Sequence, residues 1–432
     1  MRDGGRLAAA IQVLSDIETN RRPVRLALKA WGDGARYAGA KDRAWVSGLV
    51  LDVLRRRRSL AWRMGEETPR ALALGALGLL WGWPVEQIAE AAADEPHGPG
   101  PLTEAERSAL TAPRDLADAP APVQGDYPDW LDAELARAFG EDRVAQAQAL
   151  ALRAPVDLRA NRLKTGPGKA LKALEPLPVR TTGVLPEALR IDPPRADERA
   201  AAVEAMPAFV KGWVEVQDLG SQIAAACAGE VKGRQVLDLC AGGGGKTLAL
   251  AGAMENTGQI YAYDSDARRL TDTIRRAERA GVRNLQVRSP VKPDALKGLD
   301  GRMDVVFVDA PCSGTGSWRR HPDTKWRLTP QALERRTADQ DAVLDLATSF
   351  VKPGGRIVYV TCSVLPAEDE DRIAAFLGRH PQFEVRPATD DPLLARWLTP
   401  DGHLRLSPKT SSTDGFFVAV LARRDDRRPK SS

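Results

Sequence analysis

The sequence lacks the features of membrane and secreted proteins. No run approaches the roughly 18 consecutive apolar residues that a membrane-spanning helix requires. Residues 1–6 show neither the apolar core nor the cleavage site of a signal peptide. Four cysteines in 432 residues are too few for a disulfide framework. We therefore expect a cytoplasmic protein without a membrane partner.

The sequence also gives no sign of a metal site. Its cysteines, Cys227, Cys240, Cys312 and Cys362, lack the CxxC pairing of structural zinc sites. A lone histidine such as His321 does not make a metal site either. A metal site is therefore not expected.

The composition is that of a packed protein, with 43% apolar and 28% charged residues. The net charge of +4 is unevenly spread. Residues 1–70 contain 15 Lys or Arg and 8 Asp or Glu, an excess of seven positive charges, so the remainder carries −3. A basic block on a near-neutral body favours a polyanion partner, and a solvated helical surface is the alternative.

Within this block, four consecutive arginines, Arg55, Arg56, Arg57 and Arg58, follow a helical repeat of apolar residues at 45–53. Cations suit a helix C-terminus, but four exceed that need, and we interpret them as contacts to a nucleic-acid backbone. Arg159 and Asn161, at the end of a predicted strand, are further candidates. An exposed edge protected by charge explains that pair equally well.

The pattern of elements predicts an α/β protein with a doubly wound, mostly parallel sheet. Strands and helices alternate from residue 211 onward, whereas the earlier part is helical and then mixed. The predicted parts are a helical domain (1–95), a linker (96–127), a small α+β unit (128–210), a catalytic domain (211–425) and a tail (426–432). We expect a monomer.

Two predicted buried strands end in similar turns. Residues 305–309 run into Asp309-Ala310-Pro311-Cys312, and residues 357–361 run into Cys362-Ser363. Chemistry in open α/β sheets lies at the carboxyl ends of the strands, so the two thiols should lie near each other at one edge. A buried cysteine is usually a small hydrophobe, but two in matching turns favour chemistry.

A glycine-rich loop, Cys240-Ala241-Gly242-Gly243-Gly244-Gly245-Lys246, separates a predicted strand from a helix. Its end resembles a phosphate-binding loop, which makes an NTPase one alternative, but the first glycine of that motif falls on Cys240. Asp264 ends the next strand, where a dinucleotide-type fold places its ribose-binding acid. A helix N-cap is the other interpretation of Asp264.

Two thiols and no metal suit the methylation of a pyrimidine. A thiolate adds to carbon 6, carbon 5 then attacks a methyl sulfonium, and a base removes the proton at carbon 5. Asp309 would stabilise charge on the ring, and Lys246 would favour a thiolate. The residues alone do not rank Cys312 against Cys362 as the nucleophile.

With these motifs, the sequence resembles the Sun/RsmB-type (Nop/Sun) family of RNA 5-methylcytosine methyltransferases. The shared segments are 237–247, Asp264, 309–316, 320–326, 361–363 and 415–417, and the resemblance covers roughly 125–425. The segments 158–165 and 216–222 also look like family segments. The basic block is similar, more loosely, to a NusB-like RNA-binding domain.

The resemblance implies a Rossmann-like methyltransferase sheet, an all-α NusB-like domain and a small RNA-recognition-like subdomain. It implies S-adenosylmethionine as cofactor and ribosomal RNA of the small subunit as partner. Cys362 would be the nucleophile, and Cys312 would release the product. The loop 240–246 would hold the methionine part of the cofactor, Asp264 its ribose, and Asp309 would face the cofactor and the base. The insertion at 321–323 would shape the site. A non-catalytic RNA-binding or assembly factor on the same fold remains the second alternative.

Overall fold

The computed structural model describes residues 1–195, 197–198 and 201–425, so the predicted tail 426–432 lies outside the described residues. The chain forms two compact units. The helical unit comprises Met1–Arg153, Pro193–Ala200 and Ser317–Leu328. The sheet unit comprises Ala154–Asp192, Ala201–Gly316 and Thr329–Ser432. Among the described residues, no helix is long and apolar enough to cross a membrane.

The helical unit has a core of apolar residues repeated at helical spacing. In α3 the predicted stripe, which includes Val46, Leu49 and Val53, is buried together with Leu7 and Leu14 of α1. Its helices are α1 (Asp3–Asn20), α2 (Val24–Gly34), α3 (Ala40–Arg55), α4 (Arg57–Met64), α5 (Pro69–Gly75), α6 (Val85–Ala92), α7 (Glu104–Thr111), α8 (Ala121–Gln124), α9 (Asp132–Phe139), α10 (Arg143–Leu150) and α16 (Pro322–Arg327), with a π-helical turn at Ala76–Leu80.

The segment Ser317–Leu328, which carries the 321–323 insertion, belongs to the helical unit although the sheet unit flanks it in sequence. The Arg319 carbonyl accepts hydrogen bonds from Arg55 Nε and Nη2 at 3.1 and 2.9 Å. Lys325 Nζ donates to the Arg55 carbonyl at 3.1 Å. Burial lowers the pKa of Lys325 to about 7. A loop of the predicted catalytic domain is thus bound by buried polar groups of the helical unit.

The parts of the chain differ from the predicted boundaries. The predicted linker contains α7 and α8, and helices continue to Leu150, because short apolar stretches such as Leu131 and Leu135 are fully buried. The small α+β unit includes β4 (Val214–Val216), which lies beyond its predicted end at residue 210 and pairs with β1. Its sheet, in the order β2-β3-β1-β4, is antiparallel. The other elements are β1 (Val156–Ala160), α11 (Pro167–Lys172), β2 (Val179–Thr181), β3 (Ala188–Ile191) and α12 (Pro207–Val210).

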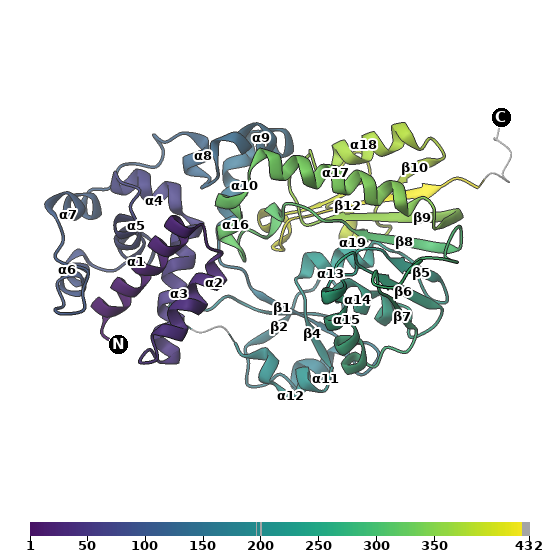
Figure 1. The fold of residues 1–432 in the computed structure, drawn as a ribbon, viewed down its shortest axis with the longest axis horizontal. Helices are drawn as coiled ribbons and strands as arrows, with labels where there is room; N and C mark the ends of the chain where they lie inside the picture. Colours follow the sequence, from purple (N-terminus) through teal and green to yellow (C-terminus); the bar gives the residue numbers. More distant parts are fainter. Residues whose placement is uncertain (196, 199–200, 426–432) are drawn as a thin grey trace. The chain divides into compact units, whose positions relative to one another are not determined.

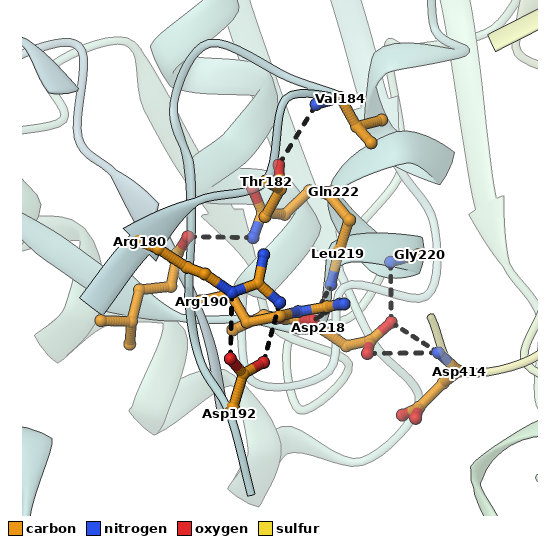
Figure 2. A network of polar contacts seen from close by, with 12 residues as sticks. Arg180, Thr182, Val184, Arg190, Asp192, Asp218, Leu219, Gly220, Gln222 and Asp414 are labelled. Atoms are coloured by element: carbon orange, nitrogen blue, oxygen red, sulfur yellow. Dashed lines mark hydrogen bonds and ion pairs between the residues drawn. The ribbon is translucent and has the colours of Figure 1, made fainter. Parts of the chain in front are cut away.

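A buried ion pair joins this small sheet to the next helix. Asp157 on β1 accepts two hydrogen bonds from Arg190 on β3, at 2.6 and 2.9 Å, and a third from the Leu219 N–H at 2.9 Å. Leu219 begins α13 (Leu219–Ala226), and Asp218 caps that helix through the Gly220 N–H at 2.7 Å. Figure 2 shows Arg190, Asp218 and Leu219 in this network. One carboxylate therefore fixes two strands and a helix start.

The large sheet confirms the predicted α/β class. Its strand order is β10-β12-β9-β8-β5-β6-β7. Strands β7, β6, β5, β8 and β9 are parallel, and β12 pairs antiparallel with both β9 and β10. The bounds are β5 (Gln235–Asp238), α14 (Gly245–Ala253), β6 (Gln259–Tyr263), α15 (Ala267–Ala280), β7 (Leu285–Arg288), β8 (Met303–Asp309), α17 (Pro330–Ala347), β9 (Val351–Thr361), α18 (Glu370–Arg379), β10 (Phe383–Arg386), α19 (Pro392–Ala395), β11 (Leu404–Leu406), α20 (Pro408–Ser411) and β12 (Phe416–Arg423).

Helices cover both faces of this sheet, with α17 and α18 on one side and α13 and α14 on the other (Figure 1). Alternate residues of β8 serve the two layers. Val305 and Phe307 pack with the α13 side, whereas Val306 and Val308 pack with the α17 side. This double burial is why β8 reads as a continuous apolar run. It places the polar residues that follow at the edge of the sheet.

We predict that Asp157→Asn lowers the free energy of unfolding by about 3–5 kcal/mol, because it leaves the buried Arg190 without its counter-charge. The matched control is Asp192→Asn, which removes a second aspartate–arginine pair, the one with Arg180 shown in Figure 2. Both side chains of that pair are more than half exposed, so the loss should stay below about 1 kcal/mol. Chemical denaturation measures both, and equal losses would contradict the prediction.

Candidate active site

The parallel pairing of β8 and β9 brings the two cysteine turns together. Their register matches Asp309 with Val360, so the strands end almost level. Cys312 follows β8 by three residues, and Cys362 follows β9 directly. Their sulfur atoms lie 3.3 Å apart. The predicted proximity of the two thiols is therefore confirmed.

Close backbone contacts fix the two turns to each other. The Gly316 N–H donates to the Cys362 carbonyl at 2.9 Å, and the Gly415 N–H donates to the Gly316 carbonyl at 2.8 Å. A Cβ on Gly316 would lie 2.2 Å from the Gly415 oxygen, so no side chain fits there. Thr315 adds a bond from its hydroxyl to Ser363 at 3.1 Å. The distance between the thiols is thus set by rigid backbone.

A lysine and an aspartate sit beside the thiols. Lys246 lies in the first turn of α14, and its Nζ lies 2.8 Å from Asp309 Oδ2. Burial lowers the pKa of Lys246, but the charge and hydrogen bond of Asp309, and the nearby Cys362, outweigh that effect and raise it. Lys246 is therefore a cation next to Cys362. The Asp309 side chain remains one third exposed and accessible to a ligand.

The two thiols differ in their surroundings. A hydrogen bond with Cys362, burial, and the charges of Cys362 and Glu368 raise the pKa of Cys312. A cation stands on the other side, because Lys246 is close enough to Cys362 for the two charges to interact. The arrangement therefore disfavours a thiolate at Cys312 and places positive charge by Cys362.

The glycine loop between β5 and α14 is held from two sides. The Gly242 N–H donates to Asp264 Oδ2 at 2.8 Å, and the Thr273 hydroxyl donates to the Gly242 carbonyl at 2.8 Å. Gly244 has a φ of +81°, and a Cβ there would lie 2.9 Å from Thr273. The backbone is thus a cradle without side chains at the carboxyl end of β5, a place where such folds bind ligands.

Asp238, the last residue of β5, lies under this cradle. Its Oδ2 accepts a hydrogen bond from the Thr247 hydroxyl at 2.6 Å, while its buried Oδ1 has no partner among the described residues. Burial raises the pKa of Asp238 to about 7, and the charge of Asp309 adds to the rise. An unpaired acid oxygen beside a glycine cradle fits a polar ligand such as the predicted cofactor. Cys240, by contrast, has its thiol pKa raised by burial and nearby acids.

The sequence of the chain is similar to that of a known family of proteins. Residues 228–422 match the family described as 16S rRNA methyltransferase RsmB/F. The probable ribosomal RNA small subunit methyltransferase B of Synechocystis sp. is 32% identical over 310 residues, which cover 69% of this chain and 67% of that protein. The chain belongs to the RsmB/F family. The predicted family is confirmed, and the NTPase alternative is wrong.

Two solved structures share the fold of this RsmB/F family member. The crystal structure of PH0851 matches with a TM-score of 0.72 at 23% identity, covering 98% of this chain and 99% of that one. The structure of NSun6 from Pyrococcus horikoshii with SFG matches with a TM-score of 0.59 at 21% identity, covering 69% of this chain and 99% of that one. Both support the Rossmann-like methyltransferase sheet.

The four predicted RNA-binding arginines of the helical unit all have intramolecular partners. Arg55 is buried against Arg319 and Asp52. Arg56 bonds the Gln148 carbonyl, Arg57 pairs with Glu18 and Glu67, and Arg58 pairs with Asp129. The run spans the junction of α3 and α4 rather than a free helix end. Its contact with RNA stays a prediction.

Arg159 and Asn161 are buried in the sheet unit. Arg159 Nε donates to Gln217 at 2.8 Å, and burial lowers its pKa to about 10. The Asn161 amide donates to the carbonyls of Gly212 and Ala280, each at 2.8 Å. Both residues link β1 to neighbouring segments. Their role in RNA binding stays a prediction, and these contacts give them a structural one.

Sequence reasoning missed Glu368 and Gln340. Glu368 follows Cys362 by six residues, and Gln340 lies on α17, a helix that was not predicted. Both are fully buried beside the Cys312 turn. Glu368 begins a run of four acids, Glu368–Asp371, and a charge run normally indicates a solvated surface, so it gives no local signal of burial. The Thr329 cap and Pro330 at the start of α17 would have been the detectable sign of the helix.

We predict that Asp238→Asn changes how stability depends on pH. The folded-state pKa of Asp238, about 7, exceeds the ordinary value of 3.8, so folding takes up a proton between these values. Stability contributed by the protonated acid is therefore lost as the pH rises from about 4 to 7. The asparagine variant cannot lose this contribution, so the difference between its unfolding midpoint and that of the wild type should increase in its favour as the pH rises from about 4 to 7. Parallel curves from pH 4 to 7 would contradict this.

Proposed function

We propose that the chain is an S-adenosylmethionine-dependent RNA cytosine-5 methyltransferase that acts on small-subunit ribosomal RNA. The observation that carries the proposal is the pair of thiols 3.3 Å apart at the ends of β8 and β9. The name of the Synechocystis relative supports the RNA class. The ordered cysteines and the intact cradle favour an enzyme over a non-catalytic factor. The cytoplasmic location and monomeric state stay predictions.

The cofactor would supply the methyl group. The loop 240–246 would hold its methionine part, Asp264 its ribose, and Asp309 would lie at its edge. The NSun6 structure with SFG, an analogue of S-adenosylmethionine, supports this assignment through the shared fold. The unpaired Oδ1 of Asp238 and the Gly244 cradle are features of this chain that suit a polar ligand.

The thiols would divide the work on the cytosine. The Cys362 thiolate, favoured by the Lys246 cation, forms a bond to carbon 6, and the ring electrons move to carbon 5. After methylation of carbon 5, Cys312 gives up its own proton to water, and the resulting thiolate takes the proton from that carbon. The electrons of the C–H bond restore the ring double bond and expel the Cys362 thiolate. Asp309 would face the base edge and stabilise charge in the ring. The cytosine must be unpaired or flipped out to reach Cys362.

We predict that Cys312→Ala, mixed with RNA and cofactor, accumulates a covalent protein–RNA adduct, because Cys362 still adds while release fails. Denaturing gels resolve the adduct. Cys362→Ala should form none, and Cys227→Ala, which removes a buried thiol outside the site, should behave like the wild type. Adduct from the Cys362 variant, or from neither variant, would sink the assignment.

RNA contacts in the helical unit would fall on exposed residues in and around α2, namely Arg21, Arg25, Arg36, Tyr37 and Lys41. All five are exposed, and Tyr37 is 73% exposed. None of the four cations forms a hydrogen bond or ion pair with another described residue. Unpaired cations beside an exposed ring are what RNA phosphates and bases bind. Part of the excess positive charge of residues 1–70 is thus exposed and available to RNA outside the arginine run.

We predict that replacing Arg21, Arg25 and Arg36 together by glutamine weakens RNA binding and lowers the slope of log K against log salt by about 2, at about 0.7 per phosphate contact. The comparison variant carries Arg57→Gln and Arg58→Gln, whose arginines are already paired. Binding measured at several salt concentrations tests both. A larger loss of RNA affinity in the comparison variant would indicate that the arginine run at 55–58 contacts the RNA instead.

A further inference from the structure

A buried acid and a buried amide hold the residues on both sides of Cys312. Glu368 accepts a hydrogen bond from the Ser313 N–H at 2.7 Å and pairs with the Ser313 hydroxyl. Gln340 on α17 donates from Nε2 to Glu368 at 3.1 Å and to the Pro311 carbonyl at 2.9 Å. Glu368 and Gln340 are both 0% exposed. The two side chains form a bracket around Cys312.

The bracket is anchored to the strand that carries the other thiol. The Tyr359 hydroxyl on β9 donates to the Glu368 carbonyl at 2.7 Å. The next residue, Asp369, accepts a hydrogen bond from the Thr361 hydroxyl at 2.6 Å. Thr361 immediately precedes Cys362. These buried hydrogen bonds hold the Cys312 turn in place relative to β9, and breaking them costs free energy.

We propose that Glu368 and Gln340 are positioning residues that hold Cys312 against Cys362 and so allow the release step. The proposal rests on the proposed function, because it assigns Cys312 to that step. Neither residue needs to touch the RNA or the cofactor. They act through Pro311 and Ser313, which flank the thiol.

The Glu368 charge has a second consequence. The charged or titratable groups that bear on Cys312 are Cys362 and Glu368, with Tyr359 of β9 also close enough to interact. Lys246 is the cation that bears on Cys362. A negative charge by one thiol and a positive charge by the other keep the proton on Cys312 while Cys362 reacts. Once Cys362 is bound to carbon, its charge no longer raises the pKa of Cys312, so the Cys312 proton can pass to water and the resulting thiolate can take the proton from carbon 5.

The charge and the geometry of Glu368 can be separated by two variants. Glu368→Gln keeps the shape and removes the charge: its amide oxygen can still accept from the Ser313 N–H, and its NH2 can donate to the Ser313 hydroxyl. Glu368→Ala removes both the charge and these contacts. Gln340→Ala opens the bracket on the Pro311 side. Glu370→Gln is the matched control, since it removes a carboxylate charge two residues away that pairs with Arg405 and does not touch the Cys312 turn.

The first test labels the full-length protein with iodoacetamide over a range of pH, without RNA or cofactor, and reads each cysteine by mass spectrometry. In the wild type, Cys312 should label only at a pH above that at which an ordinary thiol reacts, because its pKa is raised. Glu368→Gln should move the Cys312 profile to lower pH, with about tenfold faster labelling for each unit of pKa. Its Cys362 profile should stay in place. A Cys312 profile identical to that of Glu370→Gln would overturn the charge role.

The second test measures adduct with RNA and cofactor. Gln340→Ala and Glu368→Ala should form adduct at a near-normal rate and release it at least tenfold more slowly, approaching Cys312→Ala. Normal release in both variants, with adduct trapped by Cys312→Ala, would overturn the bracket and leave the proposed function standing. Absence of adduct in every variant, including Cys312→Ala, would refute the proposed function, while the labelling result would still decide whether Glu368 controls Cys312.

Discussion

The pairing of β8 with β9 is the constraint on which the site depends. Parallel strands present their carboxyl ends at one edge, and the match of Asp309 with Val360 leaves almost no stagger between them. The turns that follow can meet only there. Both faces of β8 and β9 are buried, so a shift in their register would expose apolar side chains. The packing of the core therefore keeps the thiols at their separation of 3.3 Å.

Burying charge near the thiols costs free energy, and the structure offsets that cost with hydrogen bonds. Glu368 has Ser313 and Gln340, and Lys246 has Asp309. The offset is incomplete, because Asp238 and Gln340 each keep one buried side-chain oxygen that is unpaired among the described residues. The Asp238 oxygen belongs to the residue that ends β5, just before the glycine loop. Incomplete pairing at that strand end suits a site that binds a polar molecule.

Sequence reasoning succeeded where a signal is local. A dozen residues or fewer are enough to recognise the apolar run of β8, the turn at Cys312 and the glycine loop. These local patterns were sufficient to predict the sheet and the proximity of the two thiols. It did not foresee where the arginine run would find partners. Arg55 is held by the Arg319 carbonyl, 264 positions away, and that pairing exists only once the Ser317–Leu328 segment joins the helical unit. Burial of Arg159 likewise depends on Gln217, far along the chain.

The same distinction explains why the two cysteines could not be ranked from sequence. Each follows an apolar strand and precedes a serine, so their local environments match. What separates them comes from other parts of the sheet unit: Lys246 at the start of α14 and Glu368 beyond β9. An acid beside Cys312 and a cation beside Cys362 give the two thiols different electrostatic surroundings at the same pH. The chemistry of a two-thiol site is therefore set less by the cysteines than by the charges the fold places beside each.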